Sequence, residues 1–122
     1  MNIEKIKAVI ENFSEQRDWD KFHNPKNLAM ALSVETSELV EIFQWLTHEE
    51  SLSLDSKKEE HLKEEIADIA VYLLRICFAY DIDLEEAILE KMQKNVKLNS
   101  LNGFYQKFDP IFHHFSRNLV FV

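Results

Sequence analysis

Residues 25–46 read PKNLAMALSVETSELVEIFQWL, and this stretch decides the fold. Asn24 and Pro25 begin it with a helix start, because asparagine caps helices and proline suits the first helical position. Apolar side chains then recur every three or four residues, which predicts a helix with one apolar face over residues 25–46. Glu35 and Glu38 fall inside that apolar stripe rather than opposite it. Acidic side chains on a core-facing stripe need a charged or hydrogen-bonding partner, so we expect this helix to have a role beyond packing in the core.

A second stretch, residues 57–80, repeats the pattern, with Glu65 and Asp68 inside its apolar stripe. Residues three apart share a helix face, so an antiparallel pairing of the two stripes would bring four carboxylates together. Two like charges about 5 Å apart repel by ~3 kcal/mol at an effective dielectric near 20. We expect no Lys or Arg at the interior-facing positions of these helices. Divalent cations such as Mg²⁺ or Mn²⁺ are therefore the predicted counter-charge.

Di-iron chemistry is a second metal-site hypothesis for a helical chain with paired acids. Ferritin-like di-iron bundles use Glu-x-x-His pairs. None of the five histidines in this sequence has a glutamate three residues before it. The sequence therefore favours an all-oxygen Mg²⁺ site over a di-iron site.

The rest of the chain predicts two further helices, over about residues 2–16 and 84–98, the second capped by Asp83 with Glu86 three residues later. The segments between helices read as a loop over 17–24 and a connection over 47–56. Residues 99–122 are rich in aromatic side chains and are expected to be short or irregular in structure. The expected organisation is a helical domain over 1–98 and an aromatic-rich tail over 99–122. The predicted fold is all-α, of the four-helix bundle type.

Composition excludes several classes of protein. The 122 residues include one Gly and two Pro, too few turn residues for an all-β fold, and a Gly-rich phosphate loop is ruled out. A formal net charge of −8 argues against nucleic-acid and anionic-membrane partners. Cys77 is the single cysteine, so no intrachain disulfide is possible. Without an apolar signal segment or a transmembrane stretch, a cytoplasmic protein is expected.

Aromatic and basic residues near the acids suggest a binding site. Trp19, His23, Trp45 and Tyr72 lie close to the acids in sequence or on the same helical faces. Their flat rings could stack a nucleobase, or they could be ordinary core packing. Lys91 and Asn95, spaced i and i+4, could reach phosphate and sugar, or lie on a solvated face.

Four stretches together resemble a known family. They are RDWDKFHNPKNL at 17–28, ETSELVEIFQW at 35–45, EEIADIAVYL at 64–73 and KMQKN at 91–95. Their order and spacing are similar to those of the MazG-like, all-α NTP pyrophosphohydrolases, especially the small branch that includes dCTP pyrophosphatase. The resemblance covers about residues 1–97.

The resemblance implies a helical bundle that forms a dimer or a dimer of dimers. It also implies Mg²⁺-dependent hydrolysis of a nucleoside triphosphate to the monophosphate and pyrophosphate, with dCTP or another deoxynucleotide as the candidate substrate in nucleotide-pool house-cleaning. The implied metal ligands are Glu35, Glu38, Glu65 and Asp68. The implied nucleotide pocket is lined by Trp19, His23, Trp45, Tyr72, Lys91 and Asn95.

We interpret the chain as such a hydrolase, in which Glu38 is the candidate to accept a proton from the attacking water. Two alternatives remain open: a non-enzymatic helical adaptor, and a phosphohydrolase that releases orthophosphate. Apolar stripes on residues 2–16, 84–98 and the tail predict a homo-oligomer, either a dimer or a tetramer.

Overall fold

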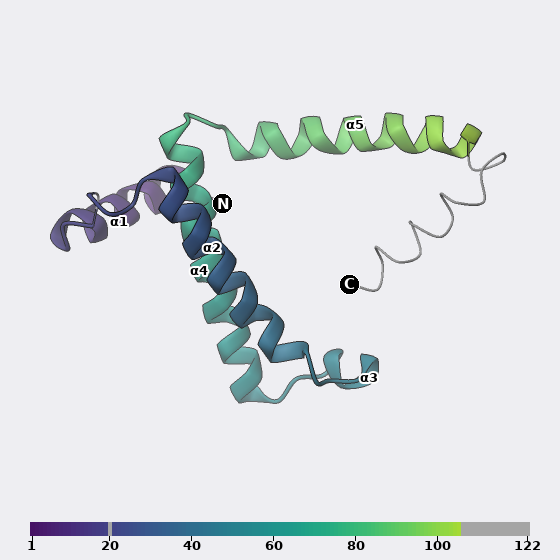
Figure 1. Ribbon diagram of the computed structural model, residues 1–122, viewed down its shortest axis with the longest axis horizontal. Helices are drawn as coiled ribbons and strands as arrows, with labels where there is room; N and C mark the ends of the chain where they lie inside the picture. The colour runs from purple at the N-terminus through teal and green to yellow at the C-terminus, as the bar shows by residue number, and fades with distance from the viewer. Residues whose placement is uncertain (20, 106–122) are drawn as a thin grey trace. The chain divides into compact units, whose positions relative to one another are not determined.

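The computed structural model describes residues 1–19 and 21–105 of the chain. This part is helical and contains no strand, which confirms the predicted all-α class (Figure 1). Its helices are α1 (Ile3–Gln16), α2 (Pro25–Phe43), α3 (His48–Ser51), α4 (Ser56–Ala79) and α5 (Leu84–Tyr105). None of the described helices has a stretch long and apolar enough to span a bilayer.

The helix starts follow from capping side chains. The Asn24 side chain accepts a hydrogen bond from the backbone N–H of Asn27 at 2.9 Å, and Pro25 follows at the first turn of α2. The Asp83 carboxylate likewise accepts from the N–H of Glu86 at 3.0 Å before α5. Both starts were predicted from sequence, because a capping side chain satisfies an N–H that has no partner within the helix.

Two helix ends differ from the sequence prediction. α2 ends at Phe43 rather than near residue 46, because Thr47 and Glu50 form a capping box that starts the short helix α3. In that box the Thr47 hydroxyl accepts from the Glu50 N–H, and the Glu50 carboxylate accepts from the Thr47 N–H at 2.7 Å. α5 continues to Tyr105, so the expectation of irregular structure is wrong for residues 99–105. The remainder of the predicted tail, 106–122, lies outside the described residues.

The residues Met1–Ile82 form one compact unit, built on an antiparallel pair of α2 and α4 (Figure 1). This pairing is the one that the two apolar stripes predict. Isoleucine, leucine and cysteine side chains on α1, α2 and α4 are buried within this unit. The buried apolar residues are Ile10, Leu28, Ile42, Leu74 and Cys77.

Contacts between α1 and α4 attach the first helix to this pair. The Arg75 guanidinium on α4 donates to the Ser14 hydroxyl on α1 at 2.6 Å, and Lys7 lies over the Phe78 ring at 5.3 Å from its centroid. Arg75 is half-buried, so the expectation that no Lys or Arg occupies an interior-facing position is wrong. Its partner lies 61 residues away in sequence, a pairing that helical spacing cannot reveal.

The second unit begins at Asp83 and contains α5. Its first turn carries Glu85 and Glu86, whose charges favour the positive end of the helix dipole. Large apolar side chains on α5 are exposed. They are Ile88, Leu89, Met92, Val96 and Leu98.

Candidate functional site

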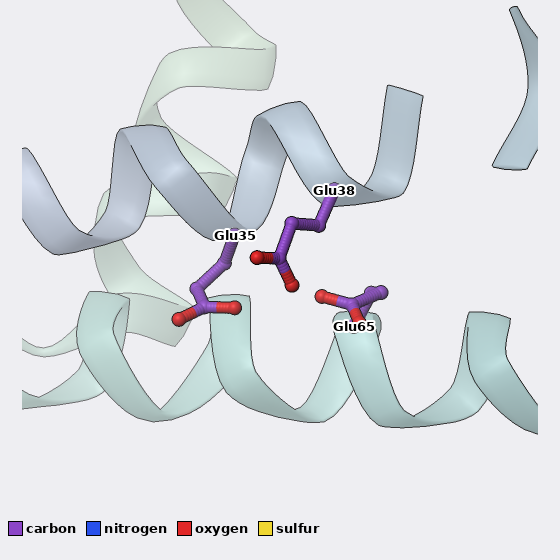
Figure 2. A group of neighbouring side chains, drawn as sticks. All are labelled: Glu35, Glu38 and Glu65. Atoms are coloured by element: carbon purple, nitrogen blue, oxygen red, sulfur yellow. The ribbon is translucent and has the colours of Figure 1, made fainter. Parts of the chain in front are cut away.

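Three carboxylates from the paired helices converge on one place, as Figure 2 shows. Glu35 and Glu38 come from α2 and Glu65 comes from α4. One oxygen of each lies within 4.8 Å of the others. Glu65 is only 5% exposed, whereas Glu35 is half-buried and Glu38 is exposed. We call these three residues the carboxylate group.

Asp68, the fourth predicted acid, lies on α4 three residues after Glu65 and is exposed. It is not part of the set of oxygens within 4.8 Å. Its charge nevertheless contributes to raising the pKa of Glu35, which places it in the same electrostatic neighbourhood. The structure therefore brings three predicted acids into direct proximity, with the fourth at the edge.

The carboxylate group is electrostatically crowded. Burial raises the pKa of Glu35 above its ordinary value, and the charges of Glu38, Asp68 and Glu65 raise it further. Protonated Glu35 would also donate a hydrogen bond to Glu65, and this bond raises the pKa of Glu35 further. A cation placed among these oxygens would relieve the same repulsion without a proton.

Glu65 supplies the observation that favours a cation. Its Oε1 lies 2.9 Å from Nε2 of His61, but its Oε2 is buried without a hydrogen-bond partner among the described residues. A buried carboxylate oxygen left without a donor is costly. An all-oxygen set with an unsatisfied buried member fits a hard divalent cation such as Mg²⁺ or Mn²⁺.

His61 is a site residue that the sequence analysis missed. The di-iron pattern places a glutamate three residues before the histidine, whereas Glu65 comes four residues after His61. The signal was available, since residues at i and i+4 on a helix are neighbours. His61 thus holds one oxygen of Glu65 from the exposed side of α4.

An aromatic wall, defined by Phe13, Trp19, His23 and Tyr72, lies beside the carboxylate group. The ring centroids are 5.4 Å apart for Phe13 and Trp19, 5.1 Å for Trp19 and His23, and 6.3 Å for His23 and Tyr72. All three pairs meet edge to face, a favoured aromatic geometry. Burial raises the pKa of Tyr72, as do the charges of Glu35 and Asp68, so Tyr72 connects the wall to the acids.

The remaining predicted pocket residues are Trp45, Lys91 and Asn95. Trp45 follows the end of α2 and is 85% exposed, so within this unit it is not a core residue. Lys91 and Asn95 lie on α5 in the second unit, Lys91 exposed and Asn95 half-buried, and are described within that helix only. The structure thus brings Trp19, His23 and Tyr72 together, and the nucleotide-binding roles of all six residues remain predictions.

Known proteins resemble this chain over most of its length. The profile of the MazG-like family matches residues 30–107. The dCTP pyrophosphatase 1 proteins of Bos taurus and Homo sapiens are 38% and 37% identical to it over 95 residues. Those alignments take in 76% of this chain and 56% of each relative, so the chain spans about half the length of the curated relatives it matches.

A solved structure shares the fold. The crystal structure of a pyrophosphatase from Archaeoglobus fulgidus DSM 4304 matches this chain with a TM-score of 0.74 and 38% sequence identity. The match covers 80% of this chain and 91% of that one. The all-α arrangement described above is therefore one that a pyrophosphatase adopts.

Proposed function

This chain belongs to the MazG-like family, and from that premise we propose that it is a nucleoside triphosphate pyrophosphohydrolase. It would cleave a (d)NTP to the (d)NMP and pyrophosphate, as part of nucleotide-pool house-cleaning. The observation that carries the proposal is the carboxylate group, with a buried, unsatisfied Glu65 oxygen, beside the aromatic wall. The names of the relatives, dCTP pyrophosphatase 1 and pyrophosphatase, support it.

The residues that would hold Mg²⁺, or Mn²⁺, are Glu35, Glu38, Glu65 and Asp68. Such a cation, when bound, offsets the charge of the triphosphate and lowers the pKa of water. The chain contributes oxygens from two paired helices, a rigid support for a site whose charges repel one another. His61 fixes one Glu65 oxygen, which leaves the buried Oε2 for the ion.

We assign Glu38 as the general base. It is the exposed member of the carboxylate group, so it has access to water. In the proposed step it accepts a proton as the water oxygen bonds to the α-phosphorus. The bond from the α-phosphorus to the bridging oxygen breaks, and pyrophosphate leaves with that oxygen.

The aromatic wall is proposed to hold the nucleobase, through Trp19, His23 and Tyr72. The exposed Trp45 offers a further stacking surface. Lys91 and Asn95 would contact phosphate and sugar. The candidate substrate is dCTP or another deoxynucleotide, by analogy with the named relatives.

We also propose that the chain forms a homodimer or homotetramer. Large apolar side chains on α2, α4 and α5 are exposed, and faces of this kind usually mark an interface. They include Met30, Val34, Val40, Ile66, Leu73, Ile88 and Leu89. Light scattering should give two or four times the chain mass of 14.5 kDa; a single-chain mass would contradict the proposal.

The test of the function is product identification. A panel of deoxy- and ribonucleoside triphosphates is incubated with the protein and Mg²⁺, and pyrophosphate and orthophosphate are measured separately. Pyrophosphate with the monophosphate is the expected result. Orthophosphate alone would favour a different phosphohydrolase, and no hydrolysis by the folded protein would favour the adaptor.

A further inference from the structure

Several hydrogen bonds hold the loop between α1 and α2, and two of the main-chain bonds end on Ser14. The Ser14 carbonyl accepts hydrogen bonds from the N–H groups of Arg17, at 3.2 Å, and Trp19, at 3.1 Å. The Trp19 carbonyl in turn accepts from the N–H groups of Phe22 and His23, at 2.9 and 3.0 Å. Successive main-chain hydrogen bonds therefore link Ser14 to Trp19 and Trp19 to His23. Trp19 and His23 carry the rings of the aromatic wall that come from the loop.

The side chain of Ser14 attaches this chain of bonds to α4. Ser14 is 2% exposed, and its hydroxyl accepts from Nη1 of Arg75 at 2.6 Å. A hydrogen bond from a charged donor to a buried acceptor is stronger than one between neutral groups in water. Arg75 lies one helical turn after Tyr72, so the bond joins the end of α1, from which the loop starts, to the helix that carries Tyr72. Ser14, Arg75 and His23 also line one hollow, of about 310 Å³.

We propose that Arg75 and Ser14 are positioning residues for nucleotide recognition. Their hydrogen bond fixes Trp19 and His23 against Tyr72, and so fixes where the base lies relative to the acids. The inference rests on the proposed function. The carboxylate group stands on α2 and α4, which pair directly, so it does not depend on this bond. Breaking the bond should therefore weaken nucleotide binding and leave the chemical step in place.

The test compares four variants with the parent chain: Ser14→Ala, Arg75→Met, the double variant and Arg75→Lys. Each single variant without the bond should raise KM about fivefold to tenfold, with kcat within about twofold. The double variant should be no worse than either single one, because both remove the same bond. Arg75→Lys keeps a cationic donor and should lie closer to the parent. Lys63→Ala, which removes an exposed ion pair with Glu59 on α4, is the matched control and should change nothing.

Amide hydrogen exchange at the Trp19 N–H, without nucleotide, gives a second readout and should be roughly tenfold faster in Ser14→Ala and Arg75→Met. An unchanged KM in both, or additive effects in the double variant, would overturn the inference. So would a raised KM in Arg75→Met with a normal Ser14→Ala, because the effect of Arg75 would then not pass through its bond to Ser14. A parent chain that releases no pyrophosphate would refute the proposed function instead, and unchanged exchange would still refute the positioning role.

Discussion

The carboxylate group and the aromatic wall lie side by side but are built in different ways. The acids stand on two long, directly paired helices, at spacings of three residues within each helix. The wall draws two of its four rings from a loop that passes through Asp18, a residue with φ of 52°. The hydrogen bond that we propose to position these rings joins two residues 61 apart in sequence. Paired helices hold the acidic side chains in a fixed geometry. The sequence of a loop can change, and with it the ligand that the loop recognises, without moving the acids.

The largest effect should follow from neutralising the acids. Replacing Glu35, Glu38 or Glu65 by glutamine, or Asp68 by asparagine, should each lower kcat by on the order of 10² or more, because transition-state electrostatics are lost. Steady-state pyrophosphate release measures this. Glu64→Gln, an exposed neighbour on α4, is the control. Near-full activity in Glu38→Gln or Asp68→Asn would show that the assignment of the acids is wrong.

Removing a tryptophan ring should have a smaller effect, and this effect should be on nucleotide binding. Trp19→Ala should weaken nucleotide binding by roughly 1–3 kcal/mol if the ring stacks the base, and should leave Mg²⁺ binding without nucleotide unchanged. Trp45→Ala should behave in the same way, and since Trp45 is 85% exposed its removal should not unfold the unit. Calorimetric titration of nucleotide and of Mg²⁺ separates the two effects. Normal nucleotide affinity in both variants would remove stacking from the proposal.

Neutralising Glu35 should raise the stability of the metal-free protein, although it lowers the activity. Because the pKa of Glu35 is raised in the folded chain, the folded state favours the protonated acid, and stability falls as pH rises from about 4.5 through the folded pKa. At neutral pH and without Mg²⁺, Glu35→Gln should therefore melt at a higher temperature than the parent. A pH series of thermal melts tests the sign. A lower melting temperature for Glu35→Gln would mean that crowding does not destabilise the site.

The smallest effect should follow from removing the N-cap of α3, Thr47. Thr47→Ala removes one half of the capping box of α3, far along α2 from the wall and past the acids. We expect a slight fall in melting temperature and unchanged kcat and KM, since neither the carboxylate group nor the wall uses α3. A large loss of activity would show that the end of α2 is part of the site.

The features of the fold and of the site that could be predicted from sequence are those that depend on the local spacing of residues. The α2 and α5 starts follow from capping side chains three residues from their partners, which the sequence displays directly. The convergence of Glu35, Glu38 and Glu65 follows from acids within the apolar stripes of two helices that pair through those stripes. The hydrogen bond of Arg75 to Ser14 could not be foreseen, because it depends on how α1 packs against α4.

Two misses were of a different kind. The contact of His61 with Glu65 is local, at a spacing of four residues, and differs from the Glu-x-x-His spacing on which the sequence-based prediction rested. The end of α5 was placed too early because composition changes at residue 99, whereas the helix continues through that change to Tyr105. A change of composition alone therefore did not mark the end of a helix here.

Titration with Mg²⁺ decides most directly whether the carboxylate group binds a divalent cation. Thermal melts of the nucleotide-free parent, Glu65→Gln and Glu64→Gln are recorded over increasing Mg²⁺. A site on the folded chain should raise the melting temperature of the parent and of Glu64→Gln progressively with metal concentration, and the rise should be lost in Glu65→Gln. An equal rise in all three proteins, or none in the parent, would contradict a metal site at Glu35, Glu38 and Glu65.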